Sequence, residues 1–250
     1  WPQQAAMTKS TWVDFHPVST ITSGAPIEFF IAGPTDAYLD LSQTMLVVRG
    51  KVTKANGGNL VATGTAEDEV SPCNNFLYTL FSDVSLTFNE KQIEGSTHMY
   101  PYRAYMSTLL QYDRNVKKHQ LYCQGFVLDD QSKMDDKTGA GFVKREKLIT
   151  GSRMFELAGP LHLDFMQQGK DLLNLVNVRV KLTPNSDGFA LLSGDTANYK
   201  IQIASAILYV RRVGIKSDIL VDHEAKLRTE EASRSEERRV GKECRSRWSP

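Results

Sequence analysis

The sequence predicts an all-β protein, an antiparallel jelly-roll sandwich with one or two short helices in its connections. Short runs of β-forming residues recur between residues 11 and 213, and turn-rich stretches separate them. Only two segments have a helical pattern, which is too little helix to cover a parallel sheet. Roughly six to eight such strands fit two packed antiparallel sheets that manage their edges by Greek-key winding.

The first strands are expected at residues 26–31 and 45–52. The second segment alternates apolar and polar side chains towards its end, as a sheet with one solvated face requires. The Asn-Gly-Gly-Asn sequence at residues 56–59 then predicts a tight turn, because Asn and Gly tolerate left-handed backbone.

Later segments alternate more strictly. Residues 83–88 alternate with period two, and residues 91–93 can return beside them as the second strand of a hairpin. Residues 177–182 alternate throughout, and so does the start of a segment that runs from residue 199 to residue 210. These patterns predict antiparallel strands with one face towards a core.

The two helical segments are short and lie between strands. Residues 74–81 follow Pro72, and residues 103–112 place several aromatic and aliphatic side chains at roughly helical spacing. Residues 139–141, with Asp129, Asp130, Asp135 and Asp136 before them, are interpreted as an exposed loop.

Composition indicates a folded globular chain. The 250 residues are 41% hydrophobic and 24% charged, close to the averages of globular proteins. No window approaches the roughly 18 to 20 apolar residues of a membrane span, and the first residues lack a signal-peptide pattern. We therefore expect neither a membrane span nor a secretion signal.

The charge is unevenly distributed along the chain. Residues 234–250 hold six Lys or Arg and three Asp or Glu, which leaves 24 basic and 26 acidic residues before them. The main body has no basic surplus, so we expect no specific nucleic-acid site. Residues 234–250 resemble the translation of a sequencing-library adapter and are predicted to be disordered. A native basic tail that contacts nucleic acid is the alternative.

The residues that could carry chemistry do not form a recognisable motif, so we expect no catalytic, cofactor or metal site. Three widely separated cysteines lack metal-ligand spacing and are expected to be free thiols. The histidines never adopt HxH, HxxxH or HExxH spacing; they are His16, His98, His119, His162 and His223. The acidic residues before residue 139 lack the calcium-loop pattern and are interpreted as a solvated loop.

Two basic clusters and one aromatic stretch have possible roles in contacts with partners. The basic clusters at residues 117–119 and 144–147 are interpreted as solvated loops, although a surface that faces nucleic acid is an alternative. The aromatic stretch at residues 100–112 favours packing or a subunit contact over ligand stacking.

Several ordered motifs together resemble the major capsid proteins of Polinton/Maverick-like elements and adintoviruses. The motifs are STWVDFHPVS at 10–19, IEF at 27–29, PCNNFL at 72–77, YPYRAY at 100–105, KMDD at 133–136, LNLVNVRV at 173–180 and AILYVRRV at 206–213. The resemblance spans about residues 10 to 227. It concerns packing and turn motifs, so it indicates kinship and carries no catalytic residue.

This resemblance implies a structural protein with two tandem jelly rolls per chain. Such chains form trimers, and these capsomers tile an icosahedral shell around double-stranded DNA. We therefore expect no enzyme activity, self-association with other capsid subunits, and a location in the virion or, during assembly, in the host nucleus or cytoplasm.

The expected domains follow from the same resemblance. They are an N-terminal tail at 1–10, the first jelly roll at 11–213, a linker towards a missing second jelly roll at 214–233, and the adapter-like tail at 234–250. The alternative function is a carbohydrate-binding or cupin-like jelly roll, since one fold hosts many functions. A cupin would need a histidine-rich metal motif, which the sequence lacks.

Overall fold

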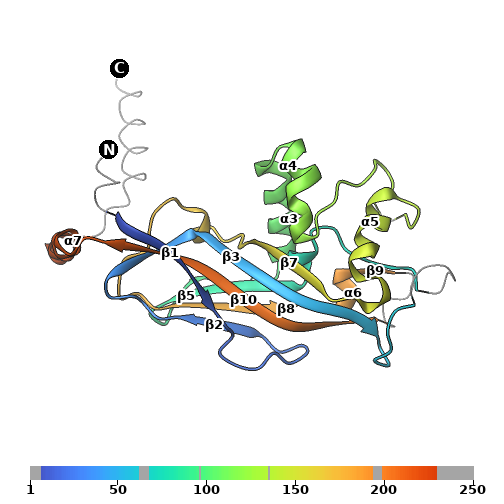
Figure 1. Ribbon diagram of the computed structural model, residues 1–250, viewed down its shortest axis with the longest axis horizontal. Helices are drawn as coiled ribbons and strands as arrows, with labels where there is room; N and C mark the ends of the chain where they lie inside the picture. Colours follow the sequence, from blue (N-terminus) through green and yellow to red (C-terminus); the bar gives the residue numbers. More distant parts are fainter. Residues whose placement is uncertain (1–6, 62–67, 96, 135, 194–198, 230–250) are drawn as a thin grey trace, which may run out of the picture.

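The computed structural model describes residues 7–61, 68–95, 97–134, 136–193 and 199–229. The adapter-like segment 234–250 lies outside these residues. The described chain forms two four-stranded antiparallel sheets and one small two-stranded sheet, which confirms the predicted fold class. The two large sheets pack face to face as a sandwich (Figure 1).

Ten strands make up the three sheets. Sheet A has the order β1 (Met7–Phe15), β10 (Tyr199–Ile215), β3 (Ala37–Lys54) and β7 (Phe155–Pro160). Sheet B has the order β2 (Ile27–Ile31), β8 (Val178–Pro184), β5 (Phe81–Phe88) and β6 (Lys91–Glu94). The small sheet pairs β4 (Val70–Pro72) with β9 (Leu191–Ser193).

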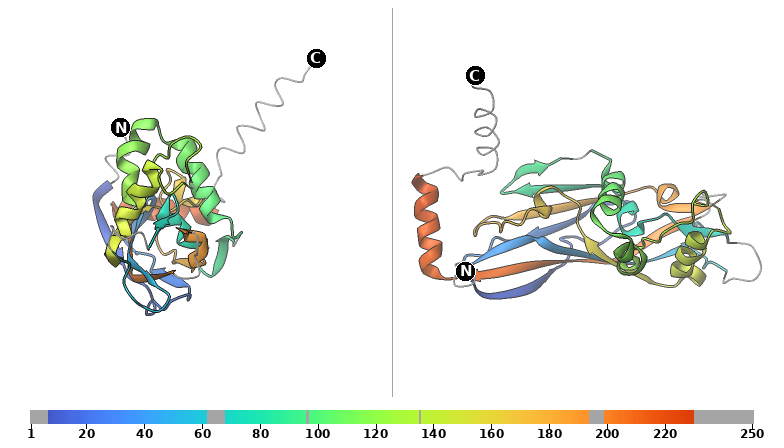
Figure 2. Two further views of the ribbon diagram at one scale, coloured as in Figure 1. Left: turned by 90° about the vertical axis from the view of Figure 1, so that its right-hand side faces the viewer. Right: turned by 90° about the horizontal axis from the view of Figure 1, so that it is seen from above.

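The strand pairing is that of one long hairpin folded back on itself. β1 pairs with β10, β2 with β8, β3 with β7, and β5 with β6. From one of these pairs to the next, the first strand comes progressively later in the chain and its partner comes progressively earlier. Successive pairs alternate between sheets A and B. A doubled chain wound in this way is a jelly roll, and Figure 2 shows its two layers from above.

Period-two alternation builds the core between the sheets. On β2, Phe29 and Ile31 are fully buried, and on β8 the buried residues are Val178, Val180 and Leu182. Leu208 and Val210 of β10 face them from sheet A. Because each fully buried side chain of this size contributes about 1.5–3 kcal/mol, the central strands carry much of the stability.

The helices lie in the connections and at one end of the sandwich. They are α2 (Phe76–Thr79), α3 (Tyr100–Gln111), α4 (Arg114–His119), α5 (Ala140–Ile149), α6 (Asp187–Ala190) and α7 (Ser217–Thr229), with the short 3-10 helices η1 (Gln120–Gln124), η2 (Thr150–Ser152) and η3 (Phe165–Gln167). In Figure 1, α3, α4 and α5 lie above sheet A on the β7 side, and α7 lies at the opposite end of the sandwich.

The structure has more helix than the sequence predicted. The helix expected at 74–81 is a single turn, since Phe81 already begins β5, whereas α3 begins three residues earlier than its predicted segment. The predicted loop at 139–141 is wrong at its last two residues, which begin α5. The expected linker at 214–233 continues β10 to Ile215 and then forms α7.

Candidate assembly surfaces

Helix α3 carries an apolar stripe on its exposed side. Tyr100, Ala104 and Thr108 face the body of the protein and are buried. Because the helix has 3.6 residues per turn, a second set of side chains lies on its opposite side. The exposed fractions of these side chains lie between 54% and 78%. This α3 stripe consists of Met99, Tyr102, Met106 and Leu110. The stretch predicted as packing or subunit contact therefore divides into one buried and one exposed face.

Polar contacts fix α3 on the sandwich. The Arg103 guanidinium lies 3.5 Å from Glu94 at the end of β6 and also pairs with Asp164. The Asn75 amide donates to Thr108 Oγ1 at 3.3 Å, on the buried side of the helix. Because both ends of α3 are held in this way, the α3 stripe projects from a fixed position.

Below α3, His162 is buried against aromatic rings. Its ring meets the Tyr78 ring edge-on, with 4.6 Å between centroids, and its backbone N–H donates to Tyr100 Oη at 3.3 Å. Burial, and secondarily the Arg103 charge, lowers the pKa of His162 to about 4. The neutral ring thus acts as a packing group under the helix.

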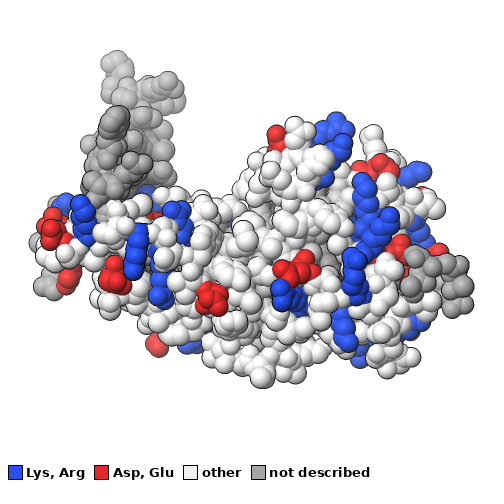
Figure 3. All heavy atoms as spheres, in the orientation of Figure 1, with Lys and Arg blue, Asp and Glu red and all other residues white. Residues whose placement is uncertain are grey.

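The outer face of sheet A has a mostly uncharged centre. Met45 of β3 lies in register between Tyr209 of β10 and Pro160 of β7. Val47 follows on the same face beside Ile207, and the exposed Trp12 continues this face onto β1. Figure 3 views the molecule from this side and shows few charges in the middle, with charges gathered towards both ends. This outer face of sheet A is therefore suited to contact with another protein surface.

The apolar run at residues 215–221 spans the end of β10 and the first turn of α7. Ile215, Ile219 and Leu220 are half-buried, whereas Val221 is exposed. A hydrogen bond of 2.7 Å joins Tyr38 Oη and His223 Nδ1, and the two rings stack. Helix α7 is therefore attached to sheet A through few contacts.

A buried polar network beside α5 shows that the prediction of solvated loops was wrong for some of their residues. Arg145 lies in the basic cluster 144–147, yet it is fully buried and bonds Asp129 Oδ1 at 2.6 Å. Its Nε donates to the Pro72 carbonyl, and Asn74 Nδ2 donates to Asp129 Oδ2 at 2.9 Å. These contacts tie α5 to β4, because a buried charge must be paired and hydrogen-bonded.

The remaining candidate residues for chemistry are scattered. His16 lies 3.3 Å from Asp14 on the surface, and His119 ends α4. Cys73 Sγ donates to the Phe189 carbonyl at 3.1 Å, and Cys123 Sγ donates to the Gln120 carbonyl at 3.0 Å. Within the described ranges, no three His, Cys, Asp or Glu side chains converge as metal ligands. Asp135 lies outside those ranges, and Asp136 accepts hydrogen bonds from Thr138.

Solved structures that are similar to this chain include chains of viral particles. A chain of the Sputnik virophage matches with a TM-score of 0.57 at 12% identity, over 85% of this chain and 49% of that chain. A chain of the PBCV-1 virus capsid matches with a TM-score of 0.50 at 14% identity, over 86% and 44%. The chain shares the jelly-roll fold of these structures. This confirms, at the level of fold, the resemblance found in the sequence.

A curated protein from Caenorhabditis elegans, the uncharacterized protein F54H12.2, is 27% identical over 191 residues. The match covers 75% of this chain and 44% of that protein. This chain thus spans less than half the length of each of these three proteins. No family model matches the chain. In the described part, no helix is long and apolar enough to cross a membrane.

Proposed function

We propose that this chain is part of a major capsid protein of the Polinton/Maverick-like and adintovirus kind and has a structural role without catalysis. The observation that carries the proposal is a capsid jelly roll with fixed, exposed apolar surfaces on α3 and sheet A. Apolar patches of more than a few hundred Å² are unusual on monomers and mark contact sites.

In this role the chain is one of two tandem jelly rolls, which is supported by its coverage of less than half of each matched protein. The tandem protein forms trimers, and the trimers tile an icosahedral shell around double-stranded DNA. The α3 stripe and sheet A contact neighbouring jelly rolls. The protein resides in the virion and assembles in the host nucleus or cytoplasm.

A carbohydrate-binding or cupin-like role would rest on different features. A cupin holds its metal with converging histidines, and the described histidines lie on separate elements. A specific, saturable hit on a glycan array would favour a lectin. No observation on this jelly roll points to either role, whereas the exposed α3 stripe points to a protein contact.

The α3 stripe gives a direct test by sedimentation velocity. We expect the chain alone to self-associate weakly and heterogeneously, because partner surfaces on a second jelly roll are missing. The double variant Met106→Lys/Leu110→Lys should reduce the association constant by about tenfold or more, since it places two charges within an apolar contact. Both residues are exposed, so the fold should be retained.

The matched control is Val18→Lys/Leu175→Lys, which adds the same charge at exposed apolar residues outside α3. This control should associate like the unmodified chain. An equal loss of association in both variants would show that the α3 stripe is not the contact. A discrete, stable trimer from the chain alone would show that a second jelly roll is dispensable for assembly and that the expected interface is wrong.

A further inference from the structure

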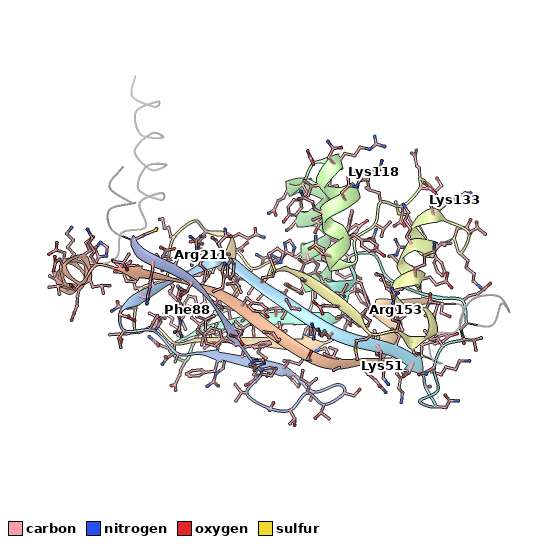
Figure 4. All side chains as sticks on the ribbon, viewed as in Figure 1. Lys51, Phe88, Lys118, Lys133, Arg153 and Arg211 are labelled. Atoms are coloured by element: carbon pink, nitrogen blue, oxygen red, sulfur yellow. The ribbon has the colours of Figure 1, made fainter. Side chains whose placement is uncertain are left out.

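One end of the sheet A face carries a row of lysine and arginine side chains from separate parts of the sequence. We call this row the basic stripe; it consists of Lys51, Lys144, Lys147, Arg153 and Lys200. In Figure 3 the basic side chains gather at the right-hand end of the molecule, and Figure 4 places Lys51 and Arg153 there. The fold therefore concentrates positive charge that is dispersed in the sequence.

Backbone register and one hydrogen bond connect the members of the basic stripe. Arg153 Nη2 donates to the Lys147 carbonyl at 3.1 Å, and Lys144 lies on the same side of α5, three residues earlier. Gly50 pairs with Phe155, so Lys51 lies at the end of β7 where Arg153 leads into it. Lys51 pairs with Gln202, and Lys200 is two residues away on the same face.

The basic stripe is not neutralised by its surroundings. Within the described part of the chain, none of its five members forms an ion pair with a carboxylate. Two nearby carboxylates are engaged by other cations, Glu156 by Arg49 at 2.5 Å and Asp68 by Lys54 at 2.9 Å. Glu146 of α5 interacts electrostatically with Lys147 and offsets part of the charge of the stripe. A positive field therefore remains over this end of the sheet, although the body of the chain is slightly acidic.

The side chains of the basic stripe fit phosphate better than a protein or a single-stranded base. Four of the five are lysines, which are depleted in protein interfaces but bind phosphate as mobile point charges. The exposed large aromatic residues among those described are Trp12, Phe30, Tyr102 and Tyr122, and none lies on α5 or beside it on β3 and β7. Bases of a single strand would need such rings for stacking.

We propose that the basic stripe binds the phosphate backbone of duplex nucleic acid without reading its sequence. The choice of duplex DNA as the polyanion rests on the proposed function, a shell around double-stranded DNA. The proposal requires that this end of the jelly roll points inward in such a shell. The contact balances part of the phosphate charge near the shell, and it is salt-dependent because bound cations release counterions.

The test uses the full chain and a labelled DNA duplex of about 30 base pairs, followed by fluorescence anisotropy over a salt series. The triple variant Lys51→Glu/Lys147→Glu/Arg153→Glu should raise the Kd about tenfold or more at low salt. Losing three phosphate contacts should also reduce the slope of log K against log salt by about 3. A neutral triple with Gln at the same positions should give a smaller change in the same direction.

The matched control is Lys91→Glu/Lys118→Glu/Lys170→Glu, which reverses three exposed lysines elsewhere and changes the net charge equally. It should change the Kd by less than about threefold. Residues 234–250 are the same in every variant and cannot cause a difference. Equal losses in stripe and control variants, or no binding at 50 mM salt, would overturn the inference.

Two further measurements separate the sources of phosphate and the two proposals. Phosphatidylserine vesicles test for a membrane; binding to vesicles that depends on the stripe, without binding to the duplex, would overturn the assignment to nucleic acid. Sedimentation velocity tests the proposed function separately. Normal self-association of a chain that does not bind DNA would end this inference alone.

Discussion

At the scale of single residues, the buried position of His162 makes the free energy of unfolding depend on pH. It lies between the Tyr78 ring and Gln167, whose Nε2 is 3.4 Å from His162 Nδ1. Its Nε2 has no hydrogen-bond partner among the described residues. Protonation of this nitrogen in the folded state would therefore leave a buried donor unpaired, which costs free energy. Because the folded pKa is about 4 and the unfolded value about 6.5, only the unfolded chain gains a proton as the pH falls through this window.

We therefore predict that His162 lowers the free energy of unfolding as the pH falls from about 6.5 to about 4, and that its contribution is flat below the folded pKa. Between pH 7 and pH 4.5 the loss should be about 2.5 kcal/mol. Denaturant unfolding of His162→Gln should show a smaller pH dependence by this amount. His119→Gln, at an exposed position, is the control and should follow the unmodified chain; parallel curves for all three would refute the assignment.

At the scale of elements, α5 depends on one buried ion pair. The Asp129 carboxylate accepts hydrogen bonds from Arg145 and Asn74. Gly141 lies so close to it that a Cβ atom at this position would overlap the carboxylate. Removing one partner leaves the other charge buried and unpaired, which costs about 3–5 kcal/mol. We predict this loss for Asp129→Asn and for Arg145→Met, measured as the free energy of unfolding in urea.

The double variant should be more stable than the sum of the two losses predicts, because it leaves no unpaired charge. Lys144→Met, one residue away on the exposed side of α5, should change stability by less than about 0.5 kcal/mol. Additive losses in the double variant would show that Asp129 and Arg145 act independently.

The same elements show what the sequence could predict. Strands β8 and β10 and the β5–β6 hairpin were predicted because their alternation follows directly from one buried face. Strand β1 was partly missed, since its residues are nearly all exposed and its position is set by pairing with β10 far along the chain. Arg145 was misread because its charged neighbours in residues 144–147 suggest solvent on every side.

The candidate surfaces also differ in how far the local sequence could predict them. The helix that carries the α3 stripe was predicted from its local spacing, and the role of the stripe as a contact stays a prediction. The apolar face of sheet A was not, although continuous apolar runs at residues 45–48 and 206–210 are a signal of strands covered on both faces. The basic stripe could not be predicted, because Lys51 and Lys200 become neighbours only through the strand register and Lys147 joins them through its contact with Arg153.

At the scale of the whole molecule, β10 is the element on which sheet A depends. It pairs with β1 on one side and with β3 on the other. A chain that ends before Tyr199 should therefore lose cooperative unfolding, as followed by circular dichroism and thermal melting. A chain that ends after Ile215 loses α7 but no described strand and should keep the cooperative transition, with a fall of a few degrees in Tm for the lost Tyr38–His223 contact. A cooperative transition in the shorter chain would contradict this dependence.

The doubled-hairpin pairing also has a consequence for synthesis. On the ribosome, β1 emerges before the other described strands of this jelly roll, and its partner β10 is the last of these strands to be translated. A nascent chain can close the β5–β6 hairpin early, whereas β1 keeps an unpaired edge until residue 215 has left the exit tunnel. Throughout that interval Trp12 and its neighbours on β1 are open to chaperones and to the same strand of other nascent chains on the polysome.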